Sequence, residues 1–304
     1  MKSILDQRHF HDEAAAYSFV ERRLWPDGPV CPHCKETVRI GKMAGKSTRR
    51  GTYKCYACRK PFTVKVGTIF ESSHVPMTHW LQAIYLMSAS KKDISANQLH
   101  RTLGCTLKTA WFIAHRMREA MRSLSLEPMG ADGAIVEADE TFIGMLEGQP
   151  RGKGGWAHKN VVLTLVERGD SARSFHVDGT RIADIAPIVR ANLKREASLM
   201  TDEASQYIAI GREFAKHQAV NHNRDEYVRG DVHINTVEGY YSIFKRGMKG
   251  VYQHYAEKHL HRYLSEFDFR YDNRVALGIN DEARAARALS GVVGKRLKYK
   301  TTDS

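Results

Sequence analysis

Two pairs of cysteines in the N-terminal part of the chain have the spacing of a metal site. Cys31 and Cys34 form one C-x2-C pair, Cys55 and Cys58 form a second, and 20 residues (55 − 34 − 1) lie between the pairs. Each pair can offer two thiolates to one ion from a tight turn, and two pairs complete the tetrahedral sulfur shell that structural zinc prefers. The pattern therefore predicts a zinc ribbon that holds one structural zinc.

Three acidic residues, far apart in the sequence, suggest a second kind of metal site. Asp139 and Asp202 lie in or at the end of expected strands, and Glu238 lies on an expected helix with Lys245 two turns further along the same face. Carboxylates are the ligands that Mg²⁺ and Mn²⁺ prefer, and two such ions assist in-line attack on a phosphodiester. We therefore expect Asp139, Asp202 and Glu238 to bind two magnesium or manganese ions, and Lys245 to hold a DNA phosphate.

The segments that must position these acids have the pattern of a mixed α/β domain. Alternating or apolar runs predict strands and one intervening helix, in the order strands 134–144, 160–169 and 171–179, helix 183–193, strand 198–202, and a further strand 216–221. A helix over 232–250 follows. The order is three strands, a helix and a fourth strand, with one acid in the first strand and another at the end of the fourth. This is the layout of an RNase H-like domain, in which helices flank a mixed sheet.

Upstream of this domain the pattern is helical and contains a candidate helix-turn-helix. Residues 95–104 and 107–124 form two amphipathic segments, Gly104 permits the turn between them, and Thr106 can cap the second. An ordinary helical hairpin is the alternative interpretation. Basic side chains on or near the second helix favour DNA binding, and the residues we expect to contact DNA are Lys108, His115, Arg116 and Arg118, together with Lys245 of the later domain.

Composition favours a polyanionic partner. The 304 residues include 47 Lys and Arg against 34 Asp and Glu, a formal net charge of +13, and such a balance favours nucleic acid binding. No run approaches the roughly 20 apolar residues of a membrane span, and the first residues lack the apolar core of a signal peptide, so we expect a cytoplasmic protein. The expected domains are a zinc ribbon with its preceding helix, a helix-turn-helix domain, a catalytic domain and a basic tail, over 1–75, 76–128, 129–290 and 291–304.

The chain resembles the ISXO2-like insertion-sequence transposases over residues 11 to 274. The segments that carry the resemblance are WPDGPVCPHC, YKCYACRKPFTVKVGTIFESS, LHRTLGCTLKTAWFIAHRMREAM, VEADETFIG, TDEASQY, HINTVEGYYSIFKRGMKGVYQH and HLHRYLSEFDFRYDNR. The resemblance implies that Asp139, Asp202 and Glu238 form a DDE triad and that Lys245 is its added basic residue. Some relatives have Asn at the third position, so Asn235 is the alternative to Glu238.

The function implied is that of a DNA transposase. Such an enzyme binds the inverted-repeat ends of an insertion sequence, cleaves DNA strands and joins them to target DNA. Because it must pair two ends, we expect at least a homodimer in the active complex, at the nucleoid of a bacterial cell. Two alternatives remain: an RNase H-like nuclease without strand transfer, and a zinc-ribbon DNA-binding regulator, descended from a transposase, without catalysis.

Overall fold

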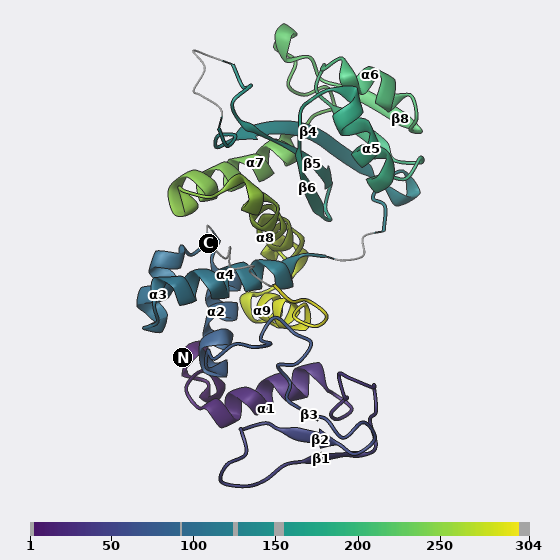
Figure 1. Ribbon diagram of the computed structural model, residues 1–304. Helices are drawn as coiled ribbons and strands as arrows, with labels where there is room; N and C mark the ends of the chain where they lie inside the picture. Colours follow the sequence, from purple (N-terminus) through teal and green to yellow (C-terminus); the bar gives the residue numbers. More distant parts are fainter. Residues whose placement is uncertain (1–2, 92, 124–126, 149–154, 298–304) are drawn as a thin grey trace. The chain divides into compact units, whose positions relative to one another are not determined.

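The structure is a computed structural model, shown in Figure 1, that describes residues 3–91, 93–123, 127–148 and 155–297. The chain forms two compact units: Met1–Arg122 together with Asn280–Ser304, and Ser123–Ile279. Part of the expected basic tail, residues 291–304, lies outside the described residues. None of the described helices is both long enough and apolar enough to cross a bilayer.

The first unit combines helices with a small antiparallel sheet. Its helices are α1 (Glu13–Leu24), α2 (Met77–Ala89), α3 (Ala96–Leu103), α4 (Leu107–Met121) and α9 (Asp281–Ser290), and two 3-10 turns, η1 (Ile4–Asp6) and η2 (Arg8–Phe10), precede α1. Its strands pair in the order β1-β2-β3, and they are β1 (Ile40–Lys42), β2 (Tyr53–Cys55) and β3 (Pro61–Phe62). Cys55 of the second cysteine pair ends β2, and Cys58 lies in the turn between β2 and β3.

Helices α3 and α4 are joined by a glycine turn, as expected for a helix-turn-helix and equally for an ordinary helical hairpin. Gly104 ends α3 with φ +64°, in the left-handed region that glycine adopts without steric cost. The Thr106 hydroxyl accepts a hydrogen bond from the Thr109 N–H and so caps α4. Buried Leu99 and Ile113 are among the side chains that place the two helices in the core of the unit.

The C-terminal end of the chain differs from the sequence-based prediction. Helix α9 packs against α2 in the first unit, whereas we expected residues 281–290 to end the catalytic domain. The cause is the apolar face of α9, since Ala288 and Leu289 are buried. Lys295, expected in a basic tail, is also buried and donates a 2.9 Å hydrogen bond to the Ala120 carbonyl.

The second unit is built on a five-stranded mixed sheet. Its strands are β4 (Ile135–Ile143), β5 (Asn160–Glu167), β6 (Ala172–Val177), β7 (Ser198–Thr201) and β8 (Lys216–Ala219). They lie in the order β6-β5-β4-β7-β8, with β4, β5 and β6 antiparallel and β7 and β8 parallel to β4. Gly169, at φ +80°, lies in the β5–β6 turn. This mixed sheet confirms the predicted α/β fold of the RNase H-like class.

Helices pack on both faces of this sheet (Figure 1). One core contains side chains of α5 (Ile182–Asn192) and α6 (Gln206–Gly211), and the other contains side chains of α7 (Asn235–Gly247) and α8 (Leu260–Asp272). A π-helical turn, η5 (Met248–Tyr252), continues α7. The remaining 3-10 turns of the unit are η3 (Ala131–Gly133), η4 (His222–Arg224), η6 (Glu257–His259) and η7 (Val275–Leu277).

Candidate functional site

The sheet register brings Asp139 and Asp202 side by side. In the parallel pairing of β4 with β7, Glu137 lies opposite Met200. Asp139 and Asp202 each follow these partners by two residues, and side chains two residues apart on a strand point to the same face. Met200 packs in the core that contains α7, so both acids lie on the α7 side of the sheet.

The electrostatics of Asp139 show that the predicted acids lie near one another. Burial, and next the negative charge of Asp202, raise the pKa of Asp139 to about 7, while Glu238 adds to the shift and Lys245 opposes it. Burial also raises the pKa of Asp202. A carboxyl group whose anion is disfavoured by neighbouring carboxylates is one that a bound cation would stabilise. The donor set therefore fits hard divalent cations.

The third acid and the lysine come from α7. Asn235, Glu238 and Ser242 are exposed on this helix and Lys245 is half-buried, which leaves the face open to a large substrate. Burial lowers the pKa of Lys245, and Asp139 opposes that shift. Both Glu238 and Asn235 lie at the start of α7, so the helix position does not separate these two alternatives for the third ligand.

Tyr241 ties α7 to the strand that carries Asp139. Its hydroxyl donates to the main-chain carbonyl of Asp139, and the Val162 carbonyl lies 3.3 Å away. The Lys245 ammonium lies 5.8 Å from the centre of the Tyr241 ring. The charges of Lys249 and Lys159 also lower the pKa of Lys245, so these two positive groups lie near Lys245.

Glu140, the acid next to Asp139, belongs to the opposite face of the sheet. It accepts a 2.6 Å hydrogen bond from the Tyr207 hydroxyl of α6, and burial raises its pKa to about 8. Glu137 shares the face of Asp139 and is fully buried, but it is missing from the sequence-based prediction. The two-residue period of a strand could have indicated it.

Three of the basic residues expected to contact DNA are buried. His115, Arg116 and Arg118 on α4 expose 0%, 5% and 2% of their surface, so the prediction that they form a DNA-contacting surface is wrong. Arg116 donates to the main-chain carbonyls of Ile69 and Glu71 inside the same unit. The C-terminal half of α4 is therefore a core element.

Lys108 is the remaining predicted DNA contact on α4, and it is exposed. It lies in the first turn of the helix, close in sequence to exposed Thr106 and Leu107. Arg101, also exposed, lies near the end of α3. The accessible part of this helix pair is thus the turn and the start of α4.

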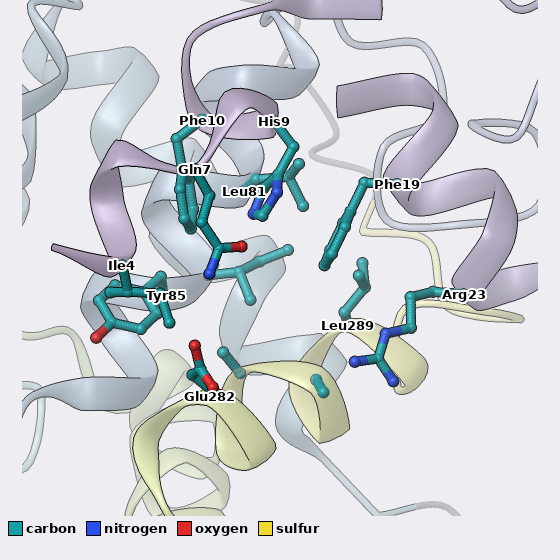
Figure 2. Close-up of a pocket in the computed structure, with 13 residues that line it drawn as sticks. Ile4, Gln7, His9, Phe10, Phe19, Arg23, Leu81, Tyr85, Glu282 and Leu289 are labelled. Atoms are coloured by element: carbon teal, nitrogen blue, oxygen red, sulfur yellow. The ribbon is translucent and has the colours of Figure 1, made fainter. Parts of the chain in front are cut away.

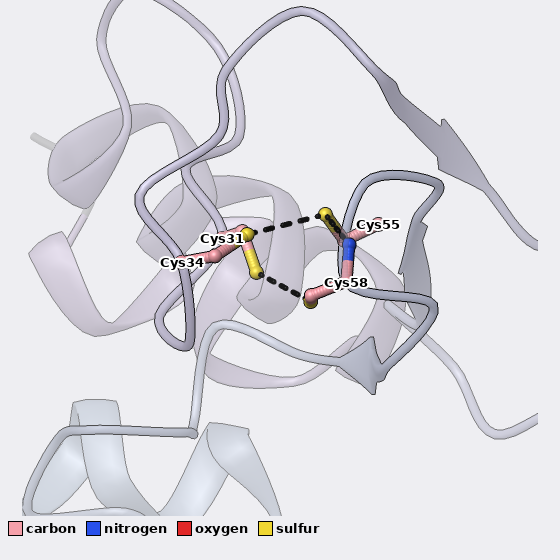
Figure 3. A group of neighbouring side chains, drawn as sticks. All are labelled: Cys31, Cys34, Cys55 and Cys58. Atoms are coloured by element: carbon pink, nitrogen blue, oxygen red, sulfur yellow. Dashed lines mark hydrogen bonds between the residues drawn. The ribbon is translucent and has the colours of Figure 1, made fainter.

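The four cysteines converge as predicted (Figure 3). The Cys31 sulfur lies 3.7 Å from that of Cys58, and the Cys34 sulfur lies 3.6 Å from that of Cys55. A tetrahedral ion with 2.3 Å zinc–sulfur bonds requires sulfurs about 3.8 Å apart, so the residues fit a structural zinc. Burial raises the pKa of the Cys31 thiol, but hydrogen bonds from the N–H groups of Cys34 and His33 lower it to about 7.

Within the described ranges, these cysteines are the one group of three or more His, Cys, Asp or Glu side chains whose ligand atoms all lie within 4.8 Å of one another. The oxygens of Asp139, Asp202 and Glu238 therefore lie more widely spaced than this.

A separate cavity of about 260 Å³ lies in the first unit, which is called the N-terminal unit below, and Figure 2 shows its lining. Apolar side chains such as Phe10 and Phe19 line it together with Arg23 and Glu282. Pockets that bind drug-sized ligands usually measure 300–1,000 Å³. Its volume falls below that range, so we assign it no ligand.

Two family models match the chain. Residues 130–272 match an ISXO2-like transposase domain, and residues 11–61 match a transposase zinc-ribbon domain. An uncharacterized protein in the transposable element ISH50 of Halobacterium salinarum is 28% identical over 282 residues, which cover 86% of this chain and 91% of that protein. The similarity thus includes both the cysteine-containing and the acid-containing parts.

Proposed function

The chain carries the zinc-ribbon and ISXO2-like domains of transposases, and from this premise we propose that it binds the inverted-repeat ends of an insertion sequence and catalyses strand cleavage and strand transfer. The observation that carries the proposal is the convergence of Asp139 and Asp202 from paired strands with Glu238 and Lys245 from α7. Two ends must be paired, so the active complex contains at least two copies of the chain.

In this proposal Asp139, Asp202 and Glu238 hold two magnesium or manganese ions. Divalent cations bound there would stabilise the attacking and leaving oxygens during in-line displacement at a phosphodiester. Lys245 contacts a phosphate of the cleaved end. Its ammonium is close enough to Asp139 for its positive charge to lower the pKa of that acid. The exposed face of α7 gives the DNA backbone access to these residues.

The N-terminal unit supplies DNA binding in this proposal. Cys31, Cys34, Cys55 and Cys58 hold one structural zinc that closes the ribbon. Lys108, exposed at the start of α4, contacts the element's ends. His115, Arg116 and Arg118 are excluded from this role by their burial.

Substitution of the acids tests the catalytic assignment. Asp139→Asn, Asp202→Asn and Glu238→Gln should each abolish cleavage and joining of DNA that carries the element's ends, because amides remove the charge that the cations require. Binding to those ends should persist. Glu140→Gln is the matched control, because Glu140 is the next residue of β4 and contacts Tyr207 on the opposite face. It should retain cleavage.

The products separate this function from its alternatives. Magnesium-dependent nicks without joined products would indicate a nuclease, and end binding without any cleavage would indicate a regulator. If Glu238→Gln keeps near-normal activity while Asn235→Ala loses it, Asn235 is the third ligand and the triad is wrong.

A further inference from the structure

Glu137 is a fully buried carboxylate on the face of β4 that carries Asp139. The two residues lie one strand repeat apart, about 6.7 Å along the strand. A buried carboxylate is costly unless hydrogen-bond donors surround it. The contacts of Glu137 therefore indicate what it does for the neighbouring site.

Four hydrogen bonds, donated by Thr236, Val237 and Arg168, hold this carboxylate. One oxygen accepts from the N–H groups of Thr236 and Val237 at 2.8 and 2.9 Å. The other oxygen accepts from the Thr236 hydroxyl at 2.8 Å and from the Arg168 Nε at 2.6 Å. The His233 Nδ1 lies 3.2 Å from the same oxygen, but it accepts the Asn235 N–H and donates nothing to Glu137. Each oxygen thus accepts two hydrogen bonds, so Glu137 is not available to bind a cation itself.

Two of these donors belong to the first turn of α7. The first N–H groups of a helix have no partner within the helix and need an external acceptor. Ile234, the residue before α7, has no side chain that could provide one. Glu137 provides it from the strand, and a carboxylate at a helix N-terminus also interacts favourably with the helix dipole.

Arg168 extends this contact to the segment that leads into α7. Besides its Nε bond to Glu137, its guanidinium donates to the main-chain carbonyls of Asp231 at 2.8 Å and His233 at 2.9 Å. Arg168 follows β5, and its own N–H donates to the Ile135 carbonyl at the start of β4. One pair of side chains therefore joins β4, the end of β5 and the entry to α7.

We propose that Glu137 and Arg168 are positioning residues that set Glu238 opposite Asp139. Glu238 directly follows Val237, whose N–H is held by the strand that carries Asp139. The inference rests on the proposed function, because it concerns the binding of the cations that Asp139, Asp202 and Glu238 would hold. Glu137 acts on them only through the position of α7.

Glu137→Gln should disturb this arrangement with little change in shape. A glutamine has one acceptor oxygen and one NH2 group. Turned toward the Thr236 and Val237 N–H groups, the NH2 would meet two donors, and turned the other way it would lose the bond from the Arg168 Nε. The first turn of α7 should then loosen and Glu238 should shift. Loss of outer-shell partners typically lowers metal affinity 10–100-fold, so we expect Mn²⁺ binding to weaken by about that factor.

The experiment measures Mn²⁺ binding to the full chain by calorimetry, without DNA, for the wild type, Glu137→Gln, Arg168→Lys and Glu238→Gln. Arg168→Lys keeps the charge but cannot make the three contacts of the guanidinium at once, and it serves if Glu137→Gln does not fold. Hydrogen exchange at the Thr236 and Val237 amides gives a second readout. Exchange there should rise while the five-stranded sheet stays protected.

Asp268→Asn is the matched control. Asp268 also ties α7 to the sheet, because it accepts hydrogen bonds from the Tyr240 hydroxyl and from the Ser174 N–H. It contacts the middle of α7 and not the first turn, so its loss should lower stability without a change in Mn²⁺ affinity.

Wild-type Mn²⁺ affinity in both Glu137→Gln and Arg168→Lys would overturn the positioning role. Equal weakening by Asp268→Asn would also overturn it, because general destabilisation would then explain the effect. If Glu238→Gln leaves Mn²⁺ binding unchanged, the proposed triad itself fails and the positioning role fails with it.

Discussion

Replacement of Arg116 by alanine should destabilise the N-terminal unit and should not act directly on DNA recognition. The guanidinium donates to the carbonyls of Ile69 and Glu71, the latter at 2.8 Å, and reaches that of Leu297 at 3.4 Å. It also lies 4.3 Å from the centre of the Phe112 ring. All these contacts lie within one unit.

The size of the effect follows from these contacts. A hydrogen bond to a charged group contributes about 1.5–3 kcal/mol, and the long contact to Leu297 adds little. Two strong bonds give about 3–6 kcal/mol, and removal of a buried charge recovers part of its desolvation cost. We expect a net loss of about 3 kcal/mol, or roughly 10 °C in Tm for a unit of this size.

Lys108→Ala provides the matched comparison, because Lys108 lies on the same helix and is exposed. It should leave the Tm within about 2 °C and weaken binding to the element's ends by about 1–3 kcal/mol if it contacts a base. Thermal melts followed by circular dichroism, and fluorescence anisotropy with end DNA well below the transition, measure both quantities. An Arg116→Ala variant with wild-type Tm but weakened end binding would refute this reasoning.

Three further predictions concern other parts of the chain. Cys55→Ser should reduce bound zinc from one equivalent per chain to nearly none and unfold the ribbon, and metal analysis showing unchanged zinc would contradict the site. Burial, and next the charge of Asp268, raise the pKa of Asp272 to about 8 from 3.8. Its contribution to stability is present below about pH 4 and is lost as the pH rises through 8. Asp272→Asn can still accept from the Ala172 N–H, so urea unfolding should show a smaller fall in stability from pH 5 to pH 8, and an equal fall would exclude this role. Lys245→Ala should reduce the salt dependence of end binding by about 0.9 in the log–log slope, the value for one lost phosphate contact; an unchanged slope would place Lys245 away from the backbone.

The cysteine cluster and the positions of the strands along the chain could be predicted because both depend on local patterns. Each cysteine pair lies within one tight turn, and the structure only closes the two turns onto each other. The first strand, expected over 134–144, is Ile135–Ile143, because alternation of apolar side chains records one buried face.

The roles of the charged side chains depended on contacts between distant segments. Residues 115, 116 and 118 read as a basic surface in the sequence, yet Arg116 is buried by carbonyls 47, 45 and 181 residues away. Glu137 was likewise hidden, because its helix partners lie 99 and 100 residues further along the chain.

The amino-acid sequence by itself determined the cluster of four cysteines, the strand-borne acids and the helix that carries Glu238. Only the tertiary structure decided which of the charged groups remain available to DNA or metal. Asp139 and Glu137 have the same charge and lie on the same face of β4, but Glu137 is surrounded by donors whereas Asp139 lies among other carboxylates. The partners that surround a charged side chain decide whether it can bind DNA or metal, and those partners are brought together only when the chain folds.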